Sequence, residues 1–176
     1  PAGWSHDALA FAVEHSILSG YGDGQLHPTD SATRAQMATM LTVMVGAVDG
    51  QKKAVITPAD LSAFQDLANG WYTPYVPEAG KRPLHFLGDG ATMAQTNESE
   101  GFAMETKITR EQAFTVIGRA FGLRDGSASD FAGYEDASRV SAYAAGCVGA
   151  LVRAGYVQGD TRNRLNPQAT ITREEL

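Results

Sequence analysis

A short string recurs three times along the chain, and this repetition constrains the fold more than any other feature. The copies are Ala32-Thr33-Arg34-Ala35-Gln36, Ile108-Thr109-Arg110-Glu111-Gln112 and Ile171-Thr172-Arg173-Glu174-Glu175. After the first two copies, apolar residues follow at i, i+3, i+4 and i+7, which is typical of one face of an amphipathic helix. The matched apolar residues are Met37, Met40, Leu41 and Met44, then Ala113, Val116, Ile117 and Ala120.

The ends of these helices are also predicted by the sequence. A threonine stands at each expected N-cap, and a Gln or Glu three residues later completes a capping box. The pairs are Thr33 with Gln36, Thr109 with Gln112, and Thr172 with Glu175. Gly46 and Gly122 stand where a left-handed residue would end the first two helices. The third string is followed only by Leu176, so we expect its helix to be truncated or to belong to residues not included.

A second matched element precedes the strings, with a constant offset of 139 residues between its first and last copies. The matched residues are Trp4, Ala8, Ala12, Gly20, Leu26, Pro28 and Arg34, then Tyr143, Cys147, Leu151, Gly159, Leu165, Pro167 and Arg173. Residues 5–18 and 144–157 are predicted to be helices, each followed by a Gly-containing turn. Cys147, at the position of Ala8, is expected to pack on the inner face of its helix.

The middle copy follows the same plan but is longer. Trp71 opens its first helix, and a polar loop insertion is predicted at about 91–107. Because two short helices cannot bury their apolar faces alone, the three copies should pack together as one all-α domain. Its predicted parts are repeat 1 over 1–47, a linker over 48–63, repeat 2 over 64–122, a linker over 123–130 and repeat 3 over 131–176.

Composition excludes several classes of function. The 176 residues carry a net charge of −6, which argues against general binding to nucleic-acid phosphates. No run approaches the roughly 18 apolar residues of a membrane span. One cysteine cannot form an internal disulfide or a cysteine cage for zinc. A calcium loop starting at Asp23 would have Arg34 at its twelfth position, where a Glu is needed. We find no catalytic motif, so we expect neither an enzyme nor a cofactor.

The Arg of each string, Arg34, Arg110 or Arg173, admits two interpretations. A cation at a helix N-terminus is disfavoured by the helix dipole, so the side chain should either pair with a nearby carboxylate or carbonyl, or form an anion site. If the site is functional, we expect exposed side chains, and replacing Arg34 or Arg110 with alanine would cost less than about 1 kcal/mol of stability. The repeated aromatics, Trp4, Trp71 and Tyr143, are either core residues or flat surfaces for a sugar ring.

Together these residues resemble the S-layer homology domain, normally found as three tandem copies. The resemblance rests on the order aromatic residue, helix, Gly-Tyr-x-Asp-Gly loop, proline, Thr-Arg string and amphipathic helix, and on Phe64-Gln65-Asp66, which is similar to the Phe-x-Asp element that opens a family repeat. It implies a pseudo-threefold helical spindle in the bacterial cell wall or S-layer. Gln36 and Gln112 replace the Glu that is usual in the family motif.

The resemblance also implies a function. Such modules anchor a larger surface protein non-covalently to an acidic, often pyruvylated, secondary cell-wall polysaccharide, in grooves between adjacent repeats. By motif position, the implied glycan-binding residues are Arg34, Arg110, Arg173, Trp4, Trp71, Tyr143, Gly20 and Gly159. An alternative is self-assembly of a surface lattice without direct glycan binding, and the sequence leaves this alternative open.

Overall fold

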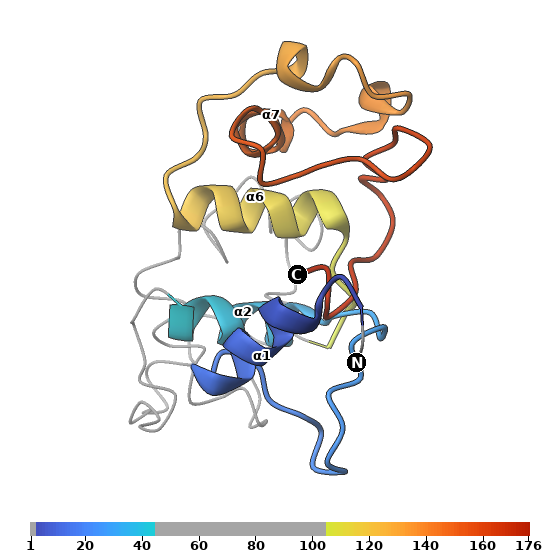
Figure 1. Cartoon of the computed structure of the whole chain (residues 1–176). Helices are drawn as coiled ribbons and strands as arrows, with labels where there is room; N and C mark the ends of the chain where they lie inside the picture. The colour runs from blue at the N-terminus through green and yellow to red at the C-terminus, as the bar shows by residue number, and fades with distance from the viewer. Residues whose placement is uncertain (1–2, 45–104) are drawn as a thin grey trace.

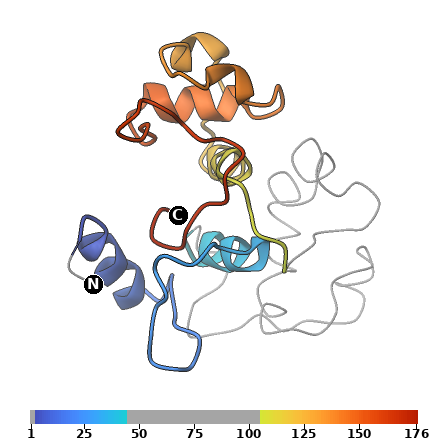
Figure 2. The same cartoon turned by 90° about the vertical axis from the view of Figure 1, so that its right-hand side faces the viewer.

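The computed structural model describes residues 3–44 and 105–176, and the regular elements of these segments are helical. They are α1 (His6–Glu14), α2 (Arg34–Met44), α6 (Arg110–Ala120) and α7 (Ala145–Arg153), with short 3-10 helices η2 (Ala128–Phe131) and η3 (Ala137–Arg139). Within these two segments there are isolated bridges but no strand, which confirms the all-α prediction there. In Figures 1 and 2, α6 lies between α7 and α2, and the C-terminus lies between α2 and α6.

The three Thr-Arg strings meet in a closed ring of backbone hydrogen bonds. The Ala32 N–H donates to the Ile171 carbonyl over 2.8 Å, the Ile171 N–H to the Ile108 carbonyl over 3.1 Å, and the Ile108 N–H to the Ala32 carbonyl over 3.0 Å. Each string therefore donates to one string and accepts from the other, as an approximate threefold relation requires. This relation is observed for the strings; the predicted spindle of three whole repeats also involves residues outside the described segments.

The predicted capping boxes are present at both long helices. At α6, the Thr109 side chain accepts from the Gln112 N–H, and the Gln112 side chain accepts from the Thr109 N–H. The same reciprocal pair joins Thr33 and Gln36 at α2. Gly122 has a φ of 75°, as predicted for a residue that ends a helix. Gly46 lies outside the described residues.

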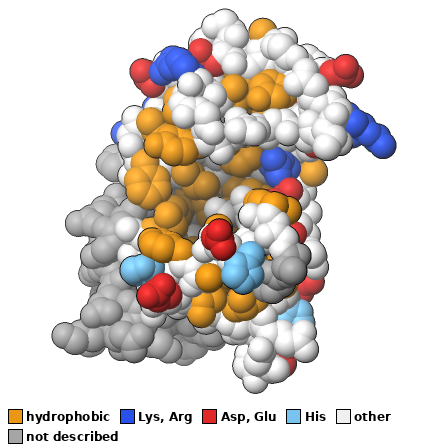
Figure 3. All heavy atoms as spheres, in the orientation of Figure 1, with side chains coloured by type: hydrophobic (Ala, Val, Ile, Leu, Met, Phe, Trp, Pro, Cys, Tyr) orange, Lys and Arg blue, Asp and Glu red, His pale blue; other side chains and the backbone are white. Residues whose placement is uncertain are grey.

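The third string starts in the same way as the other two. Thr172 donates its N–H to Glu175 Oε2 over 2.9 Å, and the Leu176 N–H donates to the Thr172 carbonyl over 3.1 Å. The second bond spans four residues, which is the spacing of an α-helical turn. Leu176 reaches an apolar groove of about 540 Å³ between α2 and α6. Figure 3 shows the gathering of apolar side chains there.

The first helix of each outer copy is shorter than predicted. We expected helices over 5–18 and 144–157, but α1 ends at Glu14 and α7 ends at Arg153. A left-handed residue follows each end, Ser16 with φ 58° and Gly155 with φ 79°. A residue in this conformation cannot continue a right-handed helix, so the chain turns there.

The core is built on α2, α6, α7, the strings and the loop that carries Leu165. Its largest fully buried side chains include Met37, Leu41, Ile108, Leu165 and Ile171. Helix α6 packs on α7, where Cys147 is 4% exposed, and burial raises the pKa of its thiol. Cys147 is thus the packing residue we predicted. Its counterpart Ala8 is exposed, because no α-helix among the described residues packs on α1 as α6 packs on α7.

The remaining domain predictions fall partly outside the described residues. The linker over 48–63, the first helix of repeat 2 with Trp71 and most of the insertion at about 91–107 lie there. The predicted linker over 123–130 is described, and it packs along α7: the Gly126 N–H donates to the Gly146 carbonyl over 3.0 Å, and η2 contacts the same helix. A membrane crossing would need a longer and more apolar helix than any in the described segments.

Candidate functional site

Two of the motif arginines, Arg110 and Arg173, reach from one copy into the loop of another. Arg110 donates its Nε–H to the Leu165 carbonyl over 2.9 Å. Arg173 makes the matching bond to the Leu26 carbonyl, also over 2.9 Å, and donates from Nη2 to the Ser19 carbonyl over 2.7 Å. Because Leu26 and Leu165 are 139 residues apart, these two interfaces are equivalent. Arg110 and Arg173 thus donate to carbonyl groups across the interface. This agrees with the first of our two interpretations, in which the arginine pairs with a nearby carboxylate or carbonyl.

The arginines are also more buried than we expected for functional residues. Arg34 and Arg173 are each 3% exposed, and the side chain of Arg110 is 15% exposed. The expectation of an exposed side chain is therefore wrong for Arg34, and the side chain of Arg110 is only partly exposed. Burial with hydrogen bonds to carbonyl groups makes such a residue part of the fold, and its removal should cost stability.

A polar groove of about 420 Å³ lies beside Arg173, and we call it the Arg173 groove. Its lining comes from the loop after α1, from α2 and its N-cap, from the segment before α6, and from Arg173 of the third string. The described lining residues are Ile17, Leu18, Ser19, Gly20, Tyr21, Thr33, Gln36, Thr39, Met40, Glu105, Lys107 and Arg173. Two sequence-predicted site residues, Gly20 and Arg173, are thus brought together in one groove.

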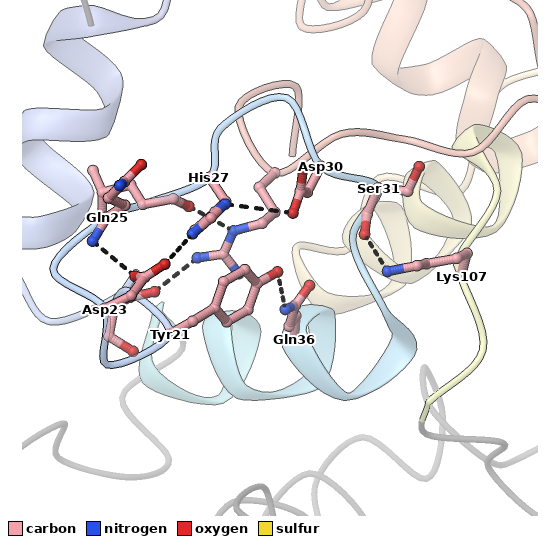
Figure 4. Close-up of polar contacts among 11 residues, drawn as sticks. Tyr21, Asp23, Gln25, His27, Asp30, Ser31, Gln36 and Lys107 are labelled. Atoms are coloured by element: carbon pink, nitrogen blue, oxygen red, sulfur yellow. Dashed lines mark hydrogen bonds and ion pairs between the residues drawn. The ribbon is translucent and has the colours of Figure 1, made fainter.

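Tyr21 forms one wall of the Arg173 groove. The guanidinium of Arg173 lies 4.6 Å from the centre of the Tyr21 ring, within the range of a cation–π contact. Gln36 donates from Nε2 to the Tyr21 hydroxyl over 2.8 Å (Figure 4). Arg173 and Gln36 thus hold the ring in place together. Tyr21 is 48% exposed and offers an aromatic surface that sequence analysis did not select.

Charged side chains surround the loop that carries Tyr21. His27 Nε2 lies 2.5 Å from Asp23 Oδ2, and His27 Nδ1 lies 3.7 Å from Asp30 Oδ2 (Figure 4). The hydrogen bond with His27 lowers the pKa of the Asp23 carboxyl, and the Gln25 N–H lowers it further. On the other side, Lys107 donates from Nζ to the Ser31 carbonyl over 2.9 Å.

The equivalent interface around Arg110 has different chemistry. Arg110 pairs with Glu175 at 2.9 Å and lies 5.2 Å from the Phe114 ring of its own helix. Asp160 stands at the position of Tyr21 and accepts hydrogen bonds within its own loop. These hydrogen bonds lower the pKa of Asp160 to about 2, and the bond from the Asn166 side chain contributes most. An acid therefore replaces the aromatic ring, and this interface is less suited to an anion.

Gly20 and Gly159 are both positions of close approach, but the neighbours are the protein's own atoms. A Cβ at Gly20 would collide with the Gln25 carbonyl, and one at Gly159 would lie 2.5 Å from Tyr134 Cε1. Both glycines therefore shape their loops. Gly20 lines the Arg173 groove and Gly159 does not.

Of the aromatics that we selected, the two within the described segments, Trp4 and Tyr143, are not among the residues that line the Arg173 groove. Trp4 is 74% exposed at the start of α1, and Trp71 lies outside the described residues. Tyr143 is half-buried, and its hydroxyl donates to Glu111 Oε1 over 3.0 Å. Tyr143 thus belongs to a polar cluster at the start of α7.

Sequence analysis missed the acid that follows the motif arginine. Glu111 is 2% exposed and accepts from the Ser141 N–H, the Ser141 hydroxyl, the Tyr143 hydroxyl and Gln168 Nε2 at 2.7–3.0 Å. Glu174 accepts from the Ser5 hydroxyl over 2.7 Å in the same way at the start of α1. The signal was present, since both strings read Thr-Arg-Glu.

Asp136 is a second missed residue. It is buried and accepts from the Leu165 and Asn166 N–H groups, each over 2.8 Å. It therefore fixes the loop whose Leu165 carbonyl receives Arg110. The string Tyr134-Glu135-Asp136 has the same aromatic-x-Asp pattern as Phe64-Gln65-Asp66 and could have identified it.

The polar cluster at Tyr143 predicts a loss of stability at alkaline pH. Burial and the neighbouring Glu111 carboxylate raise the pKa of Tyr143 from its ordinary value of 10.0. Above pH 10 the unfolded chain releases this proton while the folded chain keeps it, so the free energy of unfolding falls as pH rises. Urea unfolding at pH 7 to 11 should show this fall, and Tyr143→Phe should reduce it. Tyr156→Phe, at a position 74% exposed, should leave it unchanged, and equal slopes for all three proteins would contradict the prediction.

Comparison with known protein families matches residues 1–38 and 133–176 to the S-layer homology domain. The chain is 27% identical over 179 residues to the surface-layer 125 kDa protein of Lysinibacillus sphaericus, 25% over 176 residues to exoglucanase XynX of Acetivibrio thermocellus, and 29% over 129 residues to S-layer protein EA1 of Bacillus anthracis. These alignments cover 99%, 98% and 71% of this chain. They span 14%, 14% and 13% of the relatives, so the chain corresponds to a small part of each.

Proposed function

Through residues 1–38 and 133–176 the chain belongs to the S-layer homology family, and we propose that it anchors a larger protein by binding an acidic polysaccharide of the cell wall. The family, with its S-layer relatives, is a cell-surface module associated with the bacterial wall. The proposed ligand is a secondary cell-wall polysaccharide that carries pyruvate ketals. Each ketal bears a carboxylate, which a cationic groove can bind by charge-assisted hydrogen bonds.

The similarity to proteins of different kinds supports anchoring. The relatives bear the names of surface-layer proteins, an exoglucanase and an amylopullulanase, and the chain spans 8–14% of their lengths. A segment shared by proteins with such different names is best explained by a common attachment function. A binding module needs no catalytic residues of its own.

The observation that carries the glycan proposal is the Arg173 groove. Its described lining combines two cations, one carboxylate, the exposed Tyr21 ring and the side chains of Gln36 and Thr39, in a cleft large enough for a sugar residue. Although the chain has a net charge of −6, a local pair of cations is sufficient for a single carboxylate. Tyr21 would supply the apolar contact with the sugar ring that we first assigned to Trp4.

The proposal keeps two of the sequence-predicted binding residues, Gly20 and Arg173, because they line this groove. The others stay predictions for further grooves between the repeats. They are Arg34, Arg110, Trp4, Trp71, Tyr143 and Gly159. Since Arg110 is paired with Glu175, its interface offers less positive charge than the Arg173 groove.

A sedimentation experiment with purified walls tests the proposal. We expect the chain to co-sediment with walls that retain their polysaccharide, and to lose most of this binding when the pyruvyl groups are removed. Equal binding to walls stripped of the polysaccharide would contradict the proposal. Lattice self-assembly would instead make the chain sediment without walls, so a wall-free tube separates the two functions.

A further inference from the structure

We propose that Lys107 is the residue of the Arg173 groove that holds the acidic group of the glycan, an inference that rests on the proposed function. Three charged side chains are among the described residues that line the groove: Arg173, Lys107 and Glu105. A carboxylate ligand must therefore be met by Arg173, by Lys107 or by both. The exposure of the two cations, together with their hydrogen bonds, decides between them.

Arg173 is already engaged by the protein. Its Nε and Nη2 groups donate to the carbonyls of Leu26 and Ser19, and the Tyr21 ring lies over its guanidinium. These two bonds use two of the five N–H groups of the guanidinium, and with 3% of its surface exposed Arg173 presents little of the remainder to a ligand in the groove. Its role is to hold the loop in place, and its charge adds to the field in the groove.

Lys107 has the opposite character. It is exposed, and its ammonium group donates to the Ser31 carbonyl over 2.9 Å. An ammonium group has three N–H donors on a flexible stem, so this bond leaves donors for a ligand. Figure 4 shows Lys107 bonded to Ser31, with Tyr21 and Gln36 drawn in the same close-up. Because Tyr21 and Lys107 line the same groove, a sugar in contact with the Tyr21 ring can direct its acidic substituent to Lys107.

The approximate threefold relation gives an internal comparison. Lys107 lies three residues before Arg110, and the corresponding residues of the other strings are Ser31 and Thr170. These two hydroxyl groups lie 3.0 Å from each other and carry no charge. The ring positions are equivalent in backbone pairing, since Lys107 pairs with Thr33 as Thr170 pairs with Thr109. Of the three equivalent positions, only the one that lines the Arg173 groove carries a lysine, so this groove is the one suited to an acidic ligand.

Titration calorimetry with two synthetic probes tests this inference. The probes are a methyl hexoside that carries a 4,6-pyruvate ketal and the uncharged methyl ester of the same compound. Wild-type protein should bind the acid more tightly than the ester. Lys107→Gln should weaken binding of the acid about tenfold, the loss expected for a hydrogen bond to a charged group, and should leave the ester unchanged. Lys107→Arg should retain the preference for the acid.

Three control variants make the result specific. Thr170→Ala changes an equivalent ring position, and Arg162→Gln removes an exposed cation from another loop, so both should bind the acid as the wild type does. Glu105→Gln removes the carboxylate of the groove and should bind the acid at least as tightly. If the wild type prefers the acid and Lys107→Gln keeps that preference, the inference is overturned while the proposed function stands. If the wild type binds neither the walls nor the acid, the proposed function fails together with it.

Discussion

Replacing Arg173 with alanine is expected to lower the free energy of unfolding by about 2–4 kcal/mol, measured without any glycan present. The substitution removes the donors for the Leu26 and Ser19 carbonyls and the cation that lies under the Tyr21 ring. A carbonyl that loses its donor where water has little access costs about 1–3 kcal/mol, and both of these carbonyls face the buried Arg173 side chain. Urea unfolding followed by circular dichroism measures the change.

Two further variants separate the cause from the general effect of losing an arginine. Arg162→Ala removes an exposed arginine and should change stability by no more than about 0.5 kcal/mol. Arg173→Lys keeps the charge but not the planar fork that reaches both carbonyls, so its stability should lie between those of the wild type and the alanine variant. A loss below 1 kcal/mol for Arg173→Ala, with binding to walls abolished, would instead indicate that Arg173 serves ligand binding and not the fold.

Local features of the fold could be predicted because their causes lie within a few residues of each other. The capping box of Thr109 and Gln112 needs three residues of separation, and the left-handed Gly122 needs only its own lack of a side chain. The end of α7 before Gly155 could have been predicted in the same way, because a glycine readily adopts the left-handed conformation that ends a helix. Its counterpart Ser16 carried no such signal, and this is why the predicted first helix was too long.

Contacts between copies could not be predicted, because they depend on which copy lies beside which. Arg173 meets Ser19 across 154 residues of sequence, and no periodicity relates the two. Trp4 aligns with Tyr143, yet Trp4 is 74% exposed while Tyr143 reaches Glu111. A repeat in sequence thus fixes the position of a residue within its copy, and the neighbouring copy decides its surroundings.

The candidate site shows the same limit. Gly20 and Arg173 were selected from motif position, and they do meet in one groove. Tyr21 and Lys107 were not selected, because neither is repeated in the other described copies. Residues that repeat are those that build the interface, and residues that differ between copies give one groove its own chemistry. Searching for repetition therefore finds the first group and misses the second.

Replacing Glu111 with alanine is expected to cost about 3–5 kcal/mol of stability, because a buried acceptor of several hydrogen bonds is lost. Ser141, Tyr143 and Gln168 would lose a common partner, and among them they donate four hydrogen bonds to its carboxylate. Water cannot easily replace that partner where Glu111 is 2% exposed. Glu135→Ala, at an exposed carboxylate, should change stability by no more than about 0.5 kcal/mol.

A double-mutant cycle with Tyr143→Phe shows whether Glu111 acts through this cluster. If it does, Tyr143→Phe should cost less in the Glu111→Ala background than in the wild type, because the acceptor of its hydroxyl is already gone. Additive losses would mean that Glu111 acts through the α6 N-terminus alone, where an acid is favoured by the helix dipole. Glu174 accepts a hydrogen bond from Ser5 at the start of α1, so Glu174→Ala should also be destabilising. The loss should be smaller, because the described residues give its carboxylate one such bond and give Glu111 four. The two acids thus test whether the Thr-Arg-Glu string joins neighbouring copies through its Glu as well as through its Arg.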